Sequence, residues 1–478
     1  MKTSILSPSL NKIPQNIRHI HLMGICGTGM ASLAGILKQG GGVVTGSDQN
    51  IYPPMSILLE DLSIPVQKGY DPKNLDPLPD LVIVGNVITR ENKEAVELSR
   101  LGIPYLSFPQ ALRHFAMEGK ESIVICGTHG KTTTSTLVSW ILETAGLDPG
   151  FMIGGLPNDF SVNFKIGKGP YFVIEGDEYD TSFFDKGPKF LHYAPRIVIL
   201  TSIEFDHADI YRDIEHVIMS FRRLIDMIPA NGLLIANGDD PVINEEIKKA
   251  KCPVITYGLE GSAHWNAVDI NTGDIHTSLG IIRKGERYAD LTTPLYGYHN
   301  ISNLLSAVAL SEFLEIDIPD LHRAIKGFGG IKRRQEIKGE KRGILVLDDF
   351  AHHPTSVRET INAVKDKYKN RRLIAVFEPR SNSSRRNIFQ EKYIPSFARA
   401  DMAMIPEPTL MEKIPFEQRF SSRKLVEDLK KMGIKALYYP DTDQLIEGII
   451  KHGREGDVIL IMSNGAFENI HNRLLERL

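Results

Sequence analysis

A short apolar stretch at residues 122–126 (SIVIC) runs directly into the glycine-rich segment 127–133 (GTHGKTT), and a helix-like run follows. This order of strand, glycine loop and helix favours a parallel α/β sheet, in which backbone N–H groups at the helix start can bind a phosphate. Lys131 is then placed to reach the β- and γ-phosphates of a nucleotide, and Thr132 to offer a hydroxyl to Mg²⁺. The usual pattern has a glycine at the position of Ile125, so a purely structural glycine turn is the alternative.

Apolar strands alternate with helix-like segments along the whole chain, in three blocks that each open with a strand. Such alternation is typical of α/β domains with parallel sheets. From about residue 258 to 294 the pattern changes to short alternating segments, which predicts a small antiparallel insertion. We therefore expect three α/β domains. They are a Rossmann-like N-terminal domain (1–118), a central P-loop ATPase-type domain with the insertion (119–330) and a Rossmann-like C-terminal domain (331–478).

The composition excludes several classes of protein. At about 150 residues per domain, 478 residues suit three domains. With 56 Lys+Arg against 59 Asp+Glu, the chain lacks the basic surplus of a general nucleic-acid binder. Cys26, Cys126 and Cys252 are too few for a disulfide framework and lack metal-ligand spacing, so we expect a reducing, cytoplasmic compartment. The N-terminus has no recognisable targeting segment, and the uncharged stretch after Arg18 holds too many glycines and histidines for a membrane span.

A second glycine loop lies at residues 24–30 (GICGTGM), between a strand and a helix of the first block. Asp48 ends the next strand, where an acid that binds a ribose is expected. The glycine spacing is G-x-x-G-x-G, so a nicotinamide cofactor is not the default interpretation. The loop predicts a site for a nucleotide or sugar nucleotide, with a structural turn as the alternative.

Acidic residues follow two further strands of the central block. Glu175 ends one strand, and the next is followed by residues 204–207 (EFDH). The carboxyl ends of neighbouring parallel strands meet at the ligand crevice, so Glu175 and His207 would complete a metal site beside Thr132. Mg²⁺ prefers oxygen ligands, and a structural role is the alternative for His207. A solvated acidic loop is the alternative for the acids that follow Glu175, namely Asp177, Glu178 and Asp180.

The third block carries polar residues after three of its strands, at 348–354 (DDFAHHP), 378–382 (EPRSN) and 463–465 (SNG). Arg333 and Arg334 precede the first of these strands. Each segment alone is typical of a capped turn, but the three together predict one binding face at the edge of the sheet.

Taken together, these motifs resemble the Mur ligases, ATP-dependent enzymes that form amide bonds in peptidoglycan precursors. The resemblance covers nearly the whole chain after about residue 17, with motifs in all three blocks in family order. Segments 52–56, 204–210, 378–382 and 462–465 are most similar to the murein peptide ligase branch, which joins UDP-N-acetylmuramate to L-Ala-γ-D-Glu-meso-diaminopimelate. The sister branch, which adds L-alanine to the same nucleotide, usually has DHMD in place of DHAD and a Gln-Pro-His-Arg type segment in place of EPRSN.

The resemblance also implies roles for individual residues. The catalytic residues would be Lys131, Glu175 and His207, and the metal ligands Thr132, Glu175 and His207. ATP would contact Gly127, Thr128, His129, Gly130, Lys131, Thr132, Thr133, Asn300, Asn303, Arg334 and Asp349. The UDP-sugar would contact Gly24, Ile25, Cys26, Gly27, Thr28, Gly29, Met30, Asp48 and Asn86. The peptide would contact Arg380, Ser381, Asn382 and Asn464.

Three features depart from the family pattern. The helix after the DH motif holds no lysine that could be carbamylated, since none occurs from 208 to 247. Gln335 stands where an apolar residue is common, and Ala466 where glycine is expected. Without that lysine, a second metal site would rely on Glu175, His207 and water. Neither of the other two changes removes a charged or hydrogen-bonding group.

The resemblance implies an ADP-forming ligase that uses ATP and Mg²⁺ and passes through an acyl phosphate, with domain closure over the site. Its partners would be the two small-molecule substrates, without nucleic acid or membrane insertion, in a monomer or weak homo-oligomer. The base that deprotonates the amine would be His207 or His353, between which the sequence does not choose. The alternatives are the L-alanine ligase, a nicotinamide-dependent oxidoreductase and a catalytically silent nucleotide-binding protein.

Overall fold

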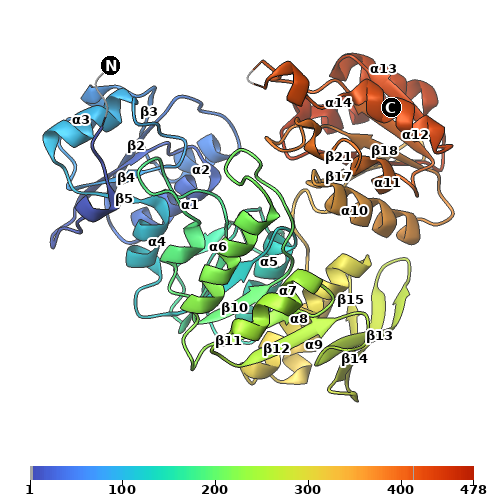
Figure 1. Ribbon diagram of the computed structural model, residues 1–478, viewed down its shortest axis with the longest axis horizontal. Helices are drawn as coiled ribbons and strands as arrows, with labels where there is room; N and C mark the ends of the chain where they lie inside the picture. The colour runs from blue at the N-terminus through green and yellow to red at the C-terminus, as the bar shows by residue number, and fades with distance from the viewer. Residues whose placement is uncertain (1–3, 413) are drawn as a thin grey trace. The chain divides into compact units, whose positions relative to one another are not determined.

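The computed structural model describes residues 4–412 and 414–478, which group into two compact units. The first unit comprises the chain up to Ile203 together with Glu215–Tyr257 and Ser306–Ala324. The second comprises Glu204–Ile214, Gly258–Leu305 and Ile325–Leu478. Figure 1 labels the helices and strands of both units.

The N-terminal part of the first unit is a five-stranded parallel sheet of order β3-β2-β1-β4-β5. Its central strand β1 is buried from Ile20 to Met23, and Leu22 and Met23 have no exposed surface, as expected for a parallel strand covered on both faces. The strands are β1 (His19–Met23), β2 (Val43–Asp48), β3 (Val66–Lys68), β4 (Leu81–Val84) and β5 (Tyr105–Ser107). The helices are α1 (Thr28–Gln39), α2 (Met55–Asp61), α3 (Lys93–Leu101) and α4 (Phe108–Ala116).

A second sheet follows in the same unit, with the order β12-β11-β10-β6-β9-β7-β8. All neighbours are parallel except β7 and β8. The strands are β6 (Glu121–Cys126), β7 (Gly150–Met152), β8 (Phe164–Lys165), β9 (Tyr171–Gly176), β10 (Ile197–Leu200), β11 (Leu233–Asn237) and β12 (Val254–Gly258). The helices are α5 (Lys131–Thr144), α6 (Ile214–Met227) and α7 (Pro241–Glu246). Helix α1 packs on this sheet through Gly35, where a Cβ would meet the Phe164 ring at 2.2 Å.

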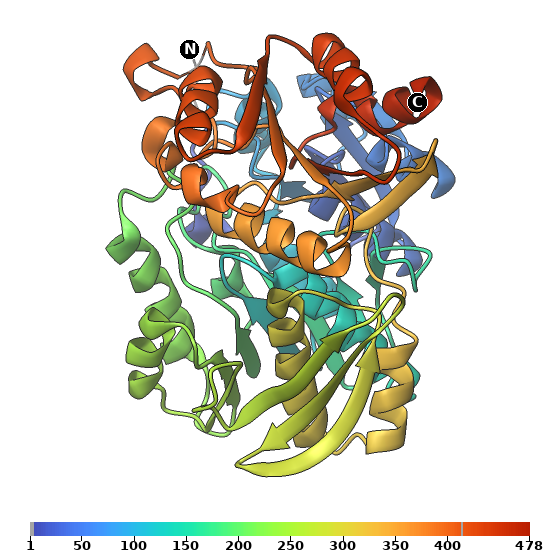
Figure 2. The same ribbon diagram turned by 90° about the vertical axis from the view of Figure 1, so that its right-hand side faces the viewer.

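The predicted antiparallel insertion is present in the second unit. Strands β13 (Trp265–Thr272), β14 (Thr277–Arg283) and β15 (Glu286–Thr293) pair antiparallel in sequence order, and Figure 2 shows them as long neighbouring arrows. Helices α8 (Tyr298–Phe313) and α9 (Ile318–Lys326) follow along the chain.

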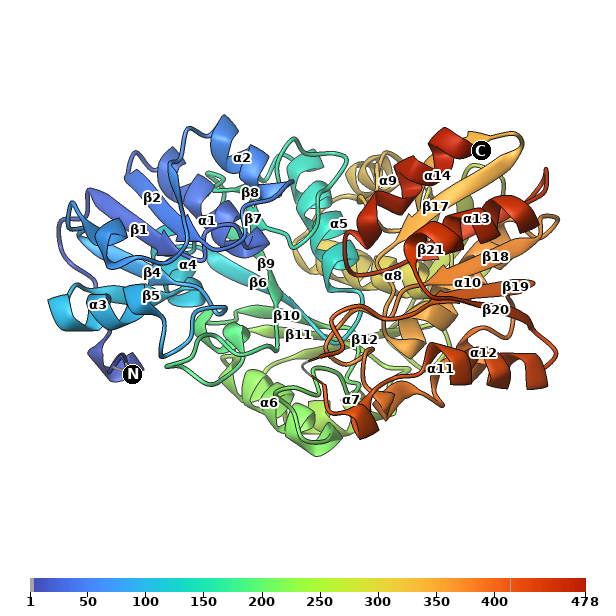
Figure 3. The same cartoon turned by 90° about the horizontal axis from the view of Figure 1, so that it is seen from above.

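The C-terminal sheet has the order β16-β17-β21-β18-β19-β20, parallel except for β16. Its strands are β16 (Glu336–Lys341), β17 (Ile344–Asp349), β18 (Leu373–Phe377), β19 (Met402–Pro406), β20 (Lys435–Tyr439) and β21 (Val458–Met462). Helices α10 (Pro354–Lys367), α11 (Tyr393–Ser396) and α12 (Ser422–Lys431) cover one face of this sheet. The other face is covered by α13 (Thr442–His452) and α14 (Ile470–Arg477) (Figure 3).

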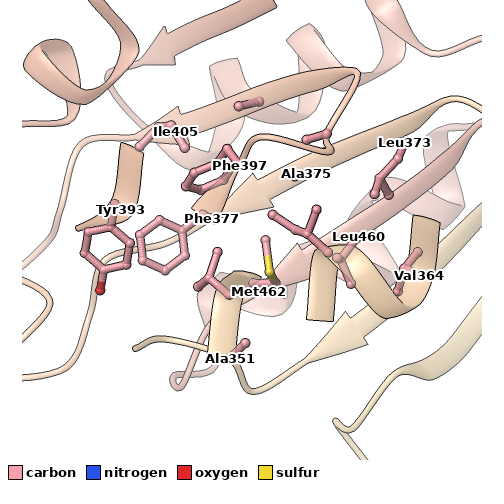
Figure 4. Packing of buried hydrophobic residues seen from close by; sticks show 14 of the residues in the cluster. Ala351, Val364, Leu373, Ala375, Phe377, Tyr393, Phe397, Ile405, Leu460 and Met462 are labelled. Atoms are coloured by element: carbon pink, nitrogen blue, oxygen red, sulfur yellow. The ribbon is translucent and has the colours of Figure 1, made fainter. Parts of the chain in front are cut away.

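The core on the α10–α12 face is aromatic. Phe377 at the end of β18 lies with its ring centroid 4.8 Å from that of Tyr393 and 6.0 Å from that of Phe397 (Figure 4). All three are fully buried, so truncating Phe377 to alanine is expected to cost about 3–5 kcal/mol. This packing fixes the carboxyl end of β18, from which residues 378–382 extend.

The predicted fold class, α/β with parallel sheets, is confirmed. Among the helices that the structure describes, none combines the length and apolar character needed to cross a membrane.

Candidate functional site

The glycine-rich segment 127–133 lies in the first unit and is called the phosphate-type loop below. Two glycines shape it. Strand β6 lies between β9 and β10, so the loop begins at the centre of the sheet. Gly127 has φ +131°, and a Cβ there would lie 2.2 Å from Thr201 Oγ1. Gly130 has φ +80° and immediately precedes α5. Both positions therefore require glycine, and the helix dipole of α5 points toward the loop.

Residues that follow β10 hold this loop in place. The Thr128 N–H donates to the Ser202 carbonyl at 3.0 Å, and the His129 N–H to Ser202 Oγ at 2.9 Å. The Thr201 hydroxyl donates to the Cys126 carbonyl at 3.0 Å. No sequence motif predicts these contacts, because Thr201 and Ser202 act through local contacts alone.

Lys131, the first residue of α5, is largely enclosed and paired, with 16% of its side chain exposed. Its ammonium donates to Glu178 Oε2 at 2.9 Å and to the Gly127 carbonyl. Burial alone would lower the pKa of Lys131, but Glu178 and Asp177 outweigh it and raise the pKa. Glu178 is only 2% exposed, so it is an ion-pair partner of the lysine and not part of a solvated loop. A permanently protonated cation is thus fixed at the loop.

Thr132 and Glu175 are brought together as the strand order predicts. The Thr132 hydroxyl donates to Glu175 Oε2 at 3.1 Å, and the Gly154 N–H donates to Glu175 Oε1 at 2.6 Å. Ser135 also approaches Oε1, at 3.4 Å. A hydroxyl and a carboxylate at the start of a phosphate-type loop form an oxygen donor set, and such a set fits Mg²⁺.

A cavity of about 270 Å³ in the first unit connects the two glycine loops. Of the predicted residues, it is lined by Gly27, Thr28, Gly29, Met30, Asn86, Lys131 and Glu175. Its lining also includes residues that sequence reasoning missed, among them Phe108, Gly154, Thr181, Lys189 and Tyr193. These come from loops and short helices without a motif, so only the folded chain reveals them.

Four further predicted residues are not among those that line the cavity but help to fix the shape of the first glycine loop. They are Gly24, Ile25, Cys26 and Asp48. Asp48 Oδ2 accepts the Cys26 N–H at 2.9 Å, and the Ser47 carbonyl accepts the Gly24 N–H at 2.8 Å. Ile25 is fully buried. Burial, together with Asp48, raises the pKa of the Cys26 thiol to about 11, so the thiol is neutral near pH 7. Asp48 thus fixes the loop's shape, and Cys26 is no thiolate nucleophile.

In the second unit, Gln335 joins two of the predicted ATP residues. Asn300 donates its side-chain N–H to Gln335 Oε1 at 3.2 Å and to the Tyr296 carbonyl at 2.9 Å. The Gln335 N–H donates to Asp349 Oδ2 at 2.9 Å. Asn303 is 7% exposed on the same helix as Asn300. Gln335, a departure from the family pattern, is therefore a link within this group.

Two predicted ATP residues lie next to Phe350. Asp349 precedes it in the chain, and Arg334 lies over its ring. Burial raises the pKa of the Asp349 carboxyl, although Arg334 acts to lower it. The Arg334 guanidinium lies 4.9 Å from the centroid of the Phe350 ring, within cation–π range. The Asp349 carboxylate accepts the Ala351 N–H at 2.8 Å, which fixes the turn after β17.

The segment at 204–207 and His353 form a second group in this unit. His353 Nδ1 accepts the Thr355 N–H at 3.3 Å, so Nε2 carries the proton that it donates to the Phe205 carbonyl at 3.2 Å. Both ring nitrogens are thus engaged, and His353 caps α10. Burial alone would raise the pKa of Asp206, but three neighbouring histidines outweigh it and hold the pKa well below its usual value. These histidines are His207, His352 and His353.

The predicted peptide residues lie after β18 and β21, which are neighbours in the sheet. Glu378 accepts from Ser463 Oγ at 2.5 Å and from Arg380 Nη1 at 3.0 Å. A Cβ at Gly465 would lie 2.0 Å from Arg380 Cδ. The structure therefore stacks Arg380 on Gly465, next to Asn464. Ser381 and Asn382 bond away from Arg380, to Ser384 and to Asp209 respectively.

Three family models match this chain in order along the sequence. The Mur ligase family catalytic domain matches residues 19–119, the Mur ligase middle domain 125–311, and the Mur ligase glutamate ligase domain 333–465. Together they span most of the described chain.

Individual relatives agree with these matches. The UDP-N-acetylmuramate–L-alanyl-γ-D-glutamyl-meso-2,6-diaminoheptandioate ligase of Escherichia coli K12 is 40% identical over 461 residues, covering 96% of this chain and 98% of its own. A UDP-N-acetylmuramate–L-alanine ligase of Desulforamulus reducens is 33% identical over 465 residues, covering 96% and 98%. The crystal structure of a murein peptide ligase from Psychrobacter arcticus 273-4 is 36% identical with a TM-score of 0.72, covering 96% and 98%. The chain belongs to the Mur ligase family.

Proposed function

We propose that this Mur ligase joins the lactyl carboxylate of UDP-N-acetylmuramate to the amine of L-Ala-γ-D-Glu-meso-diaminopimelate, with ATP cleaved to ADP and phosphate. The observation that carries this proposal is the single cavity lined by both the 27–30 loop and Lys131 with Glu175. A sugar-nucleotide loop and a phosphate-type loop on one cavity suit a reaction between a nucleotide-linked carboxylate and ATP. The 40% identity to the tripeptide ligase, against 33% to the alanine ligase, supports the tripeptide as amine substrate.

The first step brings two anions together. A carboxylate oxygen attacks the γ-phosphorus, and the bond to the ADP oxygen breaks, which leaves an acyl phosphate. Lys131, held protonated by Glu178 and Asp177, offsets the negative charge, and the amides at the start of α5 add to this. Thr132, Glu175 and His207 would hold Mg²⁺, which would neutralise charge on the transferring phosphoryl group.

In the second step the peptide amine attacks the acyl carbon, phosphate leaves, and the nitrogen loses a proton. His353 already accepts a hydrogen bond at Nδ1 and donates one from Nε2, which disfavours it as the base. His207 would serve as the base only in a step in which its ring nitrogen does not bind Mg²⁺. Arg380, Ser381, Asn382 and Asn464 would bind the peptide carboxylates, since arginine suits paired carboxylate contacts. Asn300, Asn303, Arg334 and Asp349 would bind adenine, ribose and phosphates.

On this proposal the three domains, 1–118, 119–330 and 331–478, bind the UDP-sugar, ATP and the amine substrate respectively. The three cysteines are free and buried, which suits a reducing compartment, so we place the enzyme in the cytoplasm.

Phosphate release tests the proposal. Purified protein with Mg-ATP and UDP-N-acetylmuramate is given either the tripeptide or L-alanine, and the product masses are measured. Turnover with the tripeptide and little with alanine is expected. The reverse result would retain the ligase chemistry and overturn the tripeptide assignment.

A further inference from the structure

Lys189 opens the short helix Lys189–His192 and lines the cavity that both glycine loops share. Its side chain is 12% exposed, and its ammonium contacts the Asp177 carboxylate. The Tyr179 ring centroid lies 5.5 Å from the ammonium nitrogen. A lysine this enclosed is unusual unless its charge is used, because desolvating an ammonium is costly.

Asp177 links Lys189 to the residues proposed for catalysis. It follows Glu175 by two residues at the carboxyl end of β9, and its charge acts on Lys131 as well. The cavity thus holds two lysines, one on the phosphate-type loop and one across the acidic segment. An ammonium has three N–H donors, so Lys189 can bind a second carboxylate beside that of Asp177.

We propose that Lys189 binds the lactyl carboxylate of the sugar nucleotide and makes the enzyme selective for nucleotides that carry this carboxylate. This inference rests on the proposed function and names the residue that positions its reacting group.

The chemistry of the cavity favours a carboxylate over a phosphate as the partner of Lys189. The diphosphate is expected at the 27–30 loop and the γ-phosphate at Lys131, so the carboxylate must lie between them, beside Glu175. The lining of the same cavity also contains Asp177 and Lys189. A cation there offsets the repulsion between the carboxylate and the γ-phosphate, which a neutral side chain would leave in place.

The test compares two ligands and three variants by calorimetric binding. UDP-N-acetylmuramate carries the lactyl carboxylate, and UDP-N-acetylglucosamine is the same nucleotide sugar without it. Lys189→Met keeps the apolar stem and removes the charge. Lys186→Met is the matched control, because Lys186 is exposed in the same segment and pairs with Asp180 outside the cavity lining. Lys189→Arg restores a cation.

The unmodified protein and Lys186→Met are expected to prefer the muramate nucleotide about 10- to 100-fold, as for a hydrogen-bonded charge pair. Lys189→Met is expected to lose this preference while it binds UDP-N-acetylglucosamine unchanged, and Lys189→Arg to recover part of it. Equal weakening of both ligands, or a retained preference in Lys189→Met, would overturn the inference. If the unmodified protein binds neither nucleotide, the proposed function itself falls.

Discussion

The hydroxyl of Thr132 donates a hydrogen bond to the carboxylate of Glu175 across 3.1 Å, although 43 residues separate them in the chain. The other carboxylate oxygen accepts the Gly154 N–H at 2.6 Å. Glu175 is therefore oriented by two elements of the fold, helix α5 and the segment after β7. A carboxylate held in this way is positioned before any ligand binds, which reduces the cost of ordering it.

Glu175→Gln is expected to raise the Mg²⁺ concentration needed for half-maximal phosphate release by about 10- to 100-fold. The amide keeps one acceptor oxygen for the Gly154 N–H but loses the negative charge. Phosphate release measured against Mg²⁺ concentration checks this. Glu143→Gln is the matched control, since Glu143 lies on the same helix α5 and pairs with Lys165. An unchanged Mg²⁺ dependence in Glu175→Gln would remove Glu175 from the metal site.

Gly465→Ala is expected to have the same effect on the enzyme as a substitution of Arg380. The new Cβ would lie 2.0 Å from Arg380 Cδ, so the arginine must leave its place beside Glu378. The tripeptide KM should rise about 10-fold or more, as in Arg380→Ala, because a charged hydrogen-bonding group is displaced. The KM of ATP should stay within about 2-fold. Steady-state kinetics with each substrate varied in turn measures both values.

Ala466→Gly serves as the control for that substitution, because Ala466 is adjacent and exposed. It should leave both KM values unchanged. If Gly465→Ala and Arg380→Ala raise the two KM values equally, Arg380 does not act on the peptide.

The sequence predicted the meeting of Thr132 and Glu175 because parallel strands share the position of their carboxyl ends. Glu175 lies at the end of β9, and Thr132 follows the loop that begins at the end of β6. The same reasoning placed Asp349, Glu378 and Ser463 after neighbouring strands. Lys189 escaped prediction because it lies in a short helix between strands, and nothing in strand order fixes where such a segment folds back. Tyr193, four residues on, escaped for the same reason.

Two histidines of equal promise in the sequence differ in the structure. His353 caps α10 through Nδ1 and donates from Nε2, whereas His207 follows the buried Asp206 with a backbone φ of +52°. Such a left-handed conformation at a non-glycine residue costs free energy and is found preferentially at functional sites. The hydrogen bonds of one histidine ring depend on the local backbone, so a sequence motif does not predict them.

His353→Asn is expected to keep kcat within about 3-fold of the unmodified enzyme, since asparagine is a good helix cap. His353→Ala should lower the free energy of unfolding by about 1 kcal/mol through the lost cap. His207→Asn should lower kcat by about 100-fold, because it removes the imidazole proposed as metal ligand and as base. Phosphate release and thermal unfolding of the variants check these values. A 100-fold loss in His353→Asn with intact folding would make His353 the base.

Stability at acid pH is expected to depend on Glu246 in the first unit. Arg222 donates two hydrogen bonds to this carboxylate, each at 2.8 Å, and lowers its pKa to about 2, which burial opposes and Lys249 supports. Because the folded pKa lies below the unfolded value of 4.5, the stabilisation is fully present above about pH 5 and is lost as the pH falls toward 2. With the half-exposed Arg222 taken into account, it amounts to about 1–3 kcal/mol at pH 7.

Glu246→Gln should therefore lower the thermal midpoint at pH 7, and the difference from the unmodified protein should fall by about half near pH 3. Glu245→Gln, which changes an exposed neighbour paired with Lys248, should leave the midpoint unchanged at both values. Differential scanning calorimetry across this pH range makes the measurement. A deficit of the same size at pH 7 and pH 3 would mean that Glu246 stabilises by packing, since packing does not depend on its ionisation.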